Sequence, residues 1–85
     1  MALRFRLARF GRKGRPFYRI VVADSRAPRD GMAIAHVGYY DPIKDPHEVK
    51  IDRERVKYFW EKGARPTETV RSLFRKEGIL KELTQ

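Results

Sequence analysis

The 85-residue sequence contains no cysteine and no long hydrophobic run. Without cysteine, the chain has no disulfide bridges, no thiolate ligands for a metal and no cysteine nucleophile, which excludes the stabilising devices of most small secreted domains. Its longest aliphatic stretch, from Ile20 to Ala23, has four residues. A membrane-spanning helix needs about 20. We therefore expect neither a disulfide scaffold nor a membrane protein.

Acidic residues are also scarce relative to basic ones. The sequence has 11 Asp and Glu against 20 Lys and Arg, a net charge of +9. The first 30 residues alone hold nine basic residues against two Asp, a net charge of +7, and Lys13 is the only lysine among the nine. Arginine makes planar, bidentate contacts with phosphates and stacks on bases. This pattern favours a nucleic-acid partner over a merely solvated surface or an acidic protein partner.

The apolar content is sufficient for one small core. Hydrophobic residues make up 41% of the chain and aromatic residues 12%, which argues against a disordered, charged chain. A chain of this length has room for one domain. We predict a single domain over residues 1–85, rich in strands over 1–51 and helical over 52–85.

The N-terminal half carries strand patterns. Residues 3–7 alternate apolar and basic side chains, and residues 17–24 are rich in aromatic and β-branched residues, as in a central strand. Residues 34–40 and 49–51 are predicted to be a third strand and a short fourth strand. Between the first two strands, the glycines and proline of residues 10–16 predict a turn or an open loop.

A second loop is predicted over residues 25–33, which have no periodicity and could become ordered only against a partner. Asp41, Asp45 and Glu48 superficially suggest a cation-binding loop. Two of these acids directly precede proline, and the glycine of a calcium loop is missing, so we predict a turn and no metal site.

The C-terminal half changes to a helical period. Asp52 can cap a first helix that ends at Gly63, and its apolar residues Val56, Phe59 and Trp60 are expected in the core. Thr67 can cap a second helix, with Val70, Leu73 and Phe74 on one side. Gly78 follows this helix, and Ile79 is expected to fold back onto Phe74. The prediction is an α+β fold: a small four- or five-stranded, mainly antiparallel sheet from the N-terminal half, with two C-terminal helices packed on one face.

The candidate nucleic-acid site consists of the basic residues of the first 30 positions and two strand tyrosines. Tyr18, Tyr39 and Tyr40 can stack on bases, although strand aromatics more often pack within a protein. The predicted nucleic-acid-binding residues are Arg4, Arg6, Arg9, Arg12, Lys13, Arg15, Arg19, Arg26, Arg29, Tyr18 and Tyr39.

Two alternatives remain open on residue patterns alone. A small basic ribonuclease would use His36 or His47 as a proton shuttle, but neither has a catalytic partner recognisable from spacing. An architectural DNA-binding protein is the second alternative. The sequence shows no zinc-finger spacing, basic recognition helix or RNP signature, and arginine-bearing loops suit irregular RNA slightly better than a regular groove.

Several segments resemble one known family. They are RLARFG at residues 6–11, PFYRIVVADSR at 16–26, RDG at 29–31, GYYDP at 38–42 and GARPTETV at 63–70. In order and spacing they are similar to the bacterial-type ribosomal protein S-sixteen family of the small ribosomal subunit. The resemblance covers nearly the whole chain.

The resemblance implies a structural protein with an α+β sheet domain that binds small-subunit ribosomal RNA and assists its folding during subunit assembly. It implies no enzymatic activity, no cofactor and no small-molecule substrate. It also implies that neighbouring small-subunit proteins are further partners and that the protein is located in cytoplasmic ribosomes. The positions implied to contact RNA are Arg6, Arg9, Arg12, Lys13, Arg15, Arg19, Arg26 and Arg29.

Overall fold

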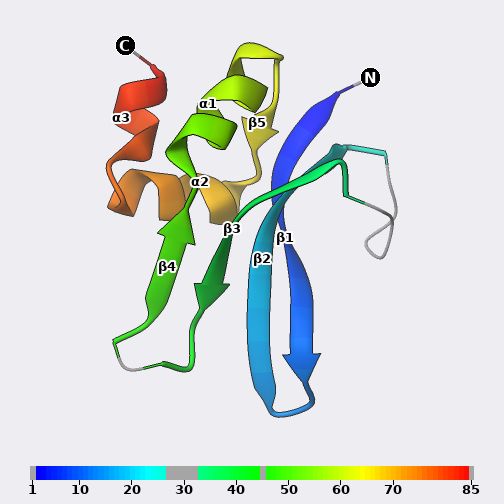
Figure 1. Ribbon diagram of the computed structural model, residues 1–85, viewed down its shortest axis with the longest axis vertical. Helices are drawn as coiled ribbons and strands as arrows, with labels where there is room; N and C mark the ends of the chain where they lie inside the picture. The colour runs from blue at the N-terminus through cyan, green and yellow to red at the C-terminus, as the bar shows by residue number, and fades with distance from the viewer. Residues whose placement is uncertain (1, 27–32, 45, 85) are drawn as a thin grey trace.

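The computed structural model describes residues 2–26, 33–44 and 46–84 (Figure 1). Its elements in chain order are β1 (Leu3–Arg12), β2 (Arg15–Asp24), β3 (Ala35–Asp41), β4 (Glu48–Ile51), α1 (Arg53–Glu61), β5 (Arg65–Pro66), α2 (Glu68–Lys76) and α3 (Ile79–Leu83). Most of the loop predicted over residues 25–33 lies outside the described residues, and so does its Arg29. Asp45 also lies outside them.

The five strands form one mixed sheet in the order β4-β3-β2-β1-β5. Neighbouring strands are antiparallel except β1 and β5, which are parallel. The predicted α+β fold is confirmed, with β2 in the middle of the sheet. One detail differs from the prediction, because β5 comes from the C-terminal half, between two helices.

The hairpin of β1 and β2 is longer than expected. The two strands pair without interruption from Leu3 opposite Asp24 to Arg12 opposite Arg15, so the loop predicted over residues 10–16 is wrong in extent. The turn itself is confined to Lys13 and Gly14, and Gly14 has φ +84°. Figure 1 shows the hairpin projecting away from the helices. Glycine and proline predicted a break here, but cross-strand pairing continues through them.

The helices begin and end largely where the capping residues predicted. Asp52 is the N-cap of α1, and its carboxylate accepts a hydrogen bond from the Arg55 backbone N–H at 3.2 Å. Gly63 follows α1 with φ +100°, and Gly78 follows α2 with φ +75°. Thr67 occupies the N-cap position of α2, but its side chain makes no capping hydrogen bond. The short helix α3 after Gly78 was not predicted.

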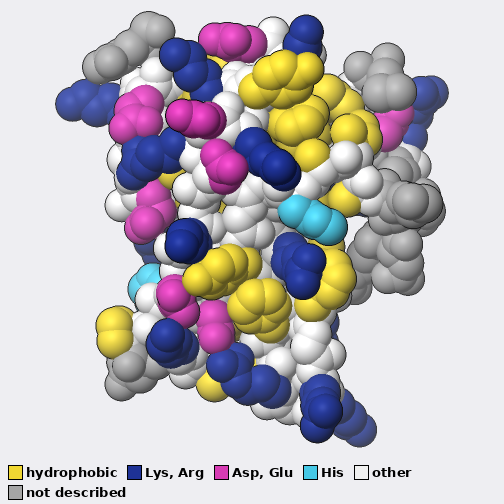
Figure 2. All heavy atoms as spheres, viewed as in Figure 1, with side chains coloured by type: hydrophobic (Ala, Val, Ile, Leu, Met, Phe, Trp, Pro, Cys, Tyr) yellow, Lys and Arg dark blue, Asp and Glu magenta, His cyan; other side chains and the backbone are white. Residues whose placement is uncertain are grey.

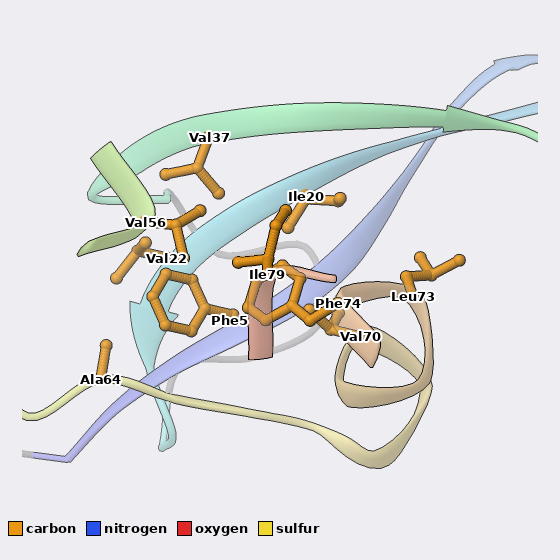
Figure 3. Packing of buried hydrophobic residues seen from close by; sticks show 10 residues of the cluster. All are labelled: Phe5, Ile20, Val22, Val37, Val56, Ala64, Val70, Leu73, Phe74 and Ile79. Carbon is orange, nitrogen blue, oxygen red and sulfur yellow. The ribbon is translucent and has the colours of Figure 1, made fainter. Parts of the chain in front are cut away.

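The core lies between one face of the sheet and the helices (Figure 3). Phe5 of β1 and Phe74 of α2 are fully buried, with their rings edge to face and their centroids 5.4 Å apart. Ile79 joins the same cluster, as predicted from its place after Gly78. Phe59 and Trp60, expected in the core, are only partly buried at its margin. The complete buried cluster is Phe5, Ile20, Val22, Val37, Val56, Ala64, Val70, Leu73, Phe74 and Ile79.

Strand alternation assigns the other side chains of β1 and β2 to the opposite face of the sheet, here called the outer face. Since Phe5 and Ile20 point into the core, Arg4, Arg6 and Arg19 belong to the outer face. Arg6 and Arg19 thus lie on the side of the sheet away from the core, whereas Arg4, next to β5, also lines a hollow with residues of the helices.

Candidate nucleic-acid interface

The tip of the β1–β2 hairpin presents the most accessible predicted site residues. Arg9, Arg12 and Lys13 are exposed, and none of their three side chains has a hydrogen bond or ion pair within the described residues. Figure 2 shows Lys and Arg side chains gathered at this lower end of the molecule. These cations are therefore free to contact an anionic partner.

Arg15, next to this tip, is already paired within the protein. Its two terminal nitrogens donate to the two carboxylate oxygens of Asp41, both at 2.8 Å, and about half of the Arg15 side chain remains exposed. Asp41 also accepts backbone N–H groups from Ile43 at 3.2 Å and Lys44 at 3.3 Å, which confirms the turn predicted there. These contacts, Arg15 foremost, lower the pKa of Asp41 from 3.8 to about 2. The structure thus places Arg15 as a clamp between the hairpin and the end of β3.

Aromatic and basic side chains lie together on the outer face. The Arg19 guanidinium carbon lies 4.7 Å from the centroid of the Phe10 ring, which is 40% exposed. The His36 ring meets Phe10 edge to face, with centroids 6.4 Å apart. In Figure 2, basic, hydrophobic and histidine side chains adjoin one another on this side of the molecule. Arg19 is accordingly held over the face of a ring by a cation–π contact.

The two predicted tyrosines have partners inside the protein. Tyr39 stacks on Phe17 with ring centroids 5.6 Å apart, and its hydroxyl donates to Glu48 at 3.1 Å, which raises the pKa of Tyr39. Tyr18 stacks on Tyr40 at 6.2 Å. Both tyrosines are half-buried. Their rings serve sheet packing, and base stacking by them stays a prediction.

The remaining predicted arginines are spread along the sheet. Arg26 is highly exposed, with its Nε 3.7 Å from the Asp24 carboxylate. Arg4 is exposed and Arg6 is half-buried. The structure thus brings the predicted residues together in two places, the hairpin tip and the outer face, and leaves Arg4 and Arg26 at the other end of the hairpin.

Sequence reasoning missed cations that the fold adds to these surfaces. Lys50 of β4 pairs with Tyr39 across the sheet, which places its side chain on the outer face. Arg55 of α1 donates to the backbone carbonyl of His36 at 3.2 Å. No local pattern marks either residue, because their positions depend on strand pairing between distant segments.

The structure shows no sign of a catalytic or metal centre in the residues it describes. His36 and His47 are both exposed, and their rings contact Phe10 and Tyr40, respectively. Among residues 2–26, 33–44 and 46–84, no group of three His, Asp or Glu residues could hold a metal ion. Within the same residues, no helix has the length and apolar character needed to cross a membrane.

The fold and the site define a class of protein, a small basic α+β domain that offers unpaired guanidinium and ammonium groups on a projecting hairpin. A model of the family described as ribosomal protein S16 matches residues 9–67. The chain is 64% identical over 80 residues to small ribosomal subunit protein bS16 of Caldanaerobacter subterraneus subsp. tengcongensis, covering 94% of this chain and 98% of the relative. It is 53% identical to small ribosomal subunit protein bS16 of Carboxydothermus hydrogenoformans over 85 residues, covering 100% and 99% of the two chains.

The chain therefore belongs to the ribosomal protein S16 family. The resemblance found in the sequence motifs is confirmed. Members of this family are structural components of the ribosome and not enzymes, so the ribonuclease alternative is wrong.

Proposed function

We propose that this protein is a structural constituent of the small ribosomal subunit that binds small-subunit ribosomal RNA and favours the compact fold of that RNA during assembly. The observation that carries the proposal is the set of unpaired cations Arg9, Arg12 and Lys13 at the hairpin tip. Relatives named small ribosomal subunit protein, over half identical across 94% and 100% of the chain, support it.

The proposed mechanism is electrostatic. Each basic side chain that neutralises a phosphate releases condensed counterions, which drives binding in a salt-dependent way. Arg15 and Asp41 fix the hairpin against β3, so the backbone that carries the unpaired cations is held in place before RNA arrives. A preorganised surface loses less conformational entropy on binding than a mobile one. Cations presented this way reduce repulsion between phosphates that approach each other in folded RNA.

The experiment compares two charge-matched double variants. Arg12→Ala/Lys13→Ala removes two unpaired cations at the tip, whereas Lys57→Ala/Lys81→Ala removes two exposed helical lysines elsewhere. Binding to a small-subunit ribosomal RNA fragment is measured over a salt series. We expect the tip variant to flatten the log–log salt dependence by about 0.7 to 0.9 per lost phosphate contact. A slope equal to that of the wild type would remove the tip from the interface.

Arg15→Ala provides a separate test of the clamp. This substitution leaves the Asp41 carboxylate without its bidentate partner, so we expect lower thermal stability as well as weaker RNA binding. The tip variant should keep the stability of the wild type. If Arg15→Ala has no effect on the melting temperature, the clamp is not a determinant of hairpin structure.

Competition with duplex DNA tests the architectural DNA alternative. If the protein is adapted to ribosomal RNA, structured RNA should compete for binding far better than duplex DNA of equal length at the same salt concentration. Equal competition would favour general polyanion or DNA binding. Neighbouring small-subunit proteins are further proposed partners, and co-sedimentation with small subunits followed by crosslinking would identify them.

A further inference from the structure

A second group of arginines lies at the opposite end of β1 from the hairpin tip. Two adjoining hollows of about 580 Å³ and about 390 Å³ share Pro66 and Arg71 in their walls. Arg75 lines the first hollow, and Arg4 and Arg65 line the second. We call these four arginines and the hollows between them the β5 groove.

The four arginines come from three elements that the fold brings together. Arg4 of β1 pairs directly with Arg65 of β5 in the parallel ladder, so the two side chains share one face. Arg71 and Arg75 are one turn apart in α2 and therefore lie on one side of that helix. The apolar residues of α2, including Phe74, are buried in the core and fix the helix in this orientation.

The charges of the β5 groove are poorly compensated inside the protein. The side chains of Arg4, Arg71 and Arg75 are exposed and have no hydrogen bond or ion pair within the described residues. Glu68 is the acidic residue among the groove-lining side chains that the structure describes. Like charges one helical turn apart destabilise a helix slightly, so this arrangement costs folding free energy that a bound anion would offset.

Arg65 is held in place by contacts other than an ion pair. Its guanidinium lies 4.0 Å from the Trp60 ring centroid and donates to the backbone carbonyls of Trp60 at 3.0 Å and Ala64 at 2.8 Å. These contacts retain its positive charge while fixing its position. The groove therefore contains one preorganised guanidinium beside three unpaired ones.

We propose that the β5 groove binds the phosphodiester backbone of a second RNA segment, separate from the segment at the hairpin tip. The proposal rests on the proposed function, because it takes ribosomal RNA as the partner. All four cations of the groove are arginine, which matches phosphate geometry better than lysine, and the Ser72 hydroxyl lines the same hollow as a further donor. An acidic protein segment is the competing occupant.

The two surfaces are far enough apart to contact different RNA segments. Arg4 and Arg12 are eight residues apart on one continuous strand, a distance of about 26 Å at ~3.3 Å per residue. In Figure 1, β5 lies near the helices at one end of the molecule, and the hairpin tip lies at the other. The protein would thus hold two RNA segments at a fixed spacing instead of adding contacts to one.

The test is a hydroxyl-radical footprint on small-subunit ribosomal RNA, with the salt dependence of binding measured in parallel. We expect the wild-type protein to protect two segments. Arg71→Ala/Arg75→Ala should lose one of them and flatten the log–log salt slope by about 1.4 to 1.8. Arg12→Ala/Lys13→Ala should lose the other, and Lys57→Ala/Lys81→Ala should keep both. Arg71→Lys/Arg75→Lys, which keeps the charge, should retain most of the slope.

The outcomes separate this inference from the proposed function. If the wild type protects no RNA, the proposed function itself fails. If hairpin variants lose protection but Arg71→Ala/Arg75→Ala keeps the wild-type footprint and slope, only the second surface is refuted. Loss of poly-glutamate binding in that groove variant, with an unchanged RNA footprint, would instead favour an acidic protein partner and overturn the proposal.

Glu68→Gln gives a test in the opposite direction. It removes the acidic side chain from the groove wall without shortening it, so RNA should bind more tightly at low salt and the salt slope should become steeper. A variant that merely perturbed the fold would bind less well. Unchanged or weaker binding by folded Glu68→Gln would count against phosphate in the β5 groove.

Discussion

Replacing Ile79 with alanine should destabilise the whole protein, although Ile79 is near the C-terminus and begins a helix of five residues. Its side chain is only 1% exposed and belongs to the same buried cluster as Phe5 and Phe74. A helix as short as α3 has no stability of its own in water. Ile79 therefore connects α3 to the core and helps close the core over β1.

The expected magnitude follows from burial. Truncating a fully buried Ile to Ala costs about 2 to 5 kcal/mol, and Ile to Val about 0.5 to 1.5 kcal/mol. A domain of this size has a total stability of roughly 4 to 13 kcal/mol. Ile79→Ala should therefore remove a large part of the free energy of unfolding and lower the melting temperature by at least about 8 °C, with Ile79→Val in between.

Urea unfolding followed by the fluorescence of Trp60, the single tryptophan, measures this effect. Trp60 is partly buried against the same core, so its emission reports on the packing that Ile79 supports. Lys81→Ala, an exposed substitution in the same helix, is the control. The reasoning is refuted if Ile79→Ala and Lys81→Ala have the same unfolding midpoint. An Ile79→Ala protein that loses helical circular dichroism while Trp60 still unfolds at the wild-type midpoint would also refute it.

Three further predictions concern the sheet and the first helix. A Cβ added at Gly38 would overlap the Lys50 carbonyl oxygen across the β3–β4 ladder, so Gly38→Ala should cost about 1 to 3 kcal/mol in urea unfolding. The pKa of Asp41 is lowered from 3.8 to about 2, so its stabilising effect is complete above pH 3.8 and disappears as the pH falls through 2. Asp41→Asn should therefore flatten the dependence of the melting temperature on pH between these two values. A pH dependence equal to that of the wild type would contradict the pairing of Asp41 with Arg15. Asp52→Ala, which removes the N-cap of α1, should lower stability by about 0.5 to 2 kcal/mol, whereas Asp52→Ser should retain most of it.

Local patterns were sufficient for most elements of this fold. The aromatic and β-branched run of β2 identified the central strand, and Asp52 with Gly63 identified both ends of α1. Each of these signals acts within a few residues through side-chain geometry or backbone conformation. Elements whose structure is determined by neighbouring residues were therefore predictable from the sequence.

The missed features depend on distant segments. β5 has two residues, one of them a proline, and exists because it pairs with β1 near the other end of the chain. Proline tolerates this place because β5 is an edge strand. Helix α3 is too short to be stable alone, although most of its residues are good helix formers, and it forms because the core accepts Ile79.

The candidate site was predictable as a charge distribution but not as a set of available groups. Arg12 and Arg15 lie close together in the sequence and carry the same charge. The Arg12 side chain is nevertheless unpaired, whereas Arg15 is bound to Asp41, 26 residues away. The arginines of the β5 groove were missed for a related reason. Their half of the chain has a net charge of only +2, and the fold gathers Arg65, Arg71 and Arg75 beside Arg4.

The parallel pairing of β5 with β1 has a consequence for synthesis of the chain. The outer edge of β1 pairs with Arg65 and Pro66 and also accepts the Thr67 backbone N–H at its Phe5 carbonyl, at 3.0 Å. During translation this edge remains unsatisfied until residue 67 has left the exit tunnel of the ribosome that makes it. An unpaired strand edge can recruit another chain, and the arginines of β1 disfavour such pairing by mutual repulsion. β1 thus leaves the tunnel before β5 but is fully hydrogen-bonded only after β5 has followed. Until then, its positive charge disfavours pairing with other chains.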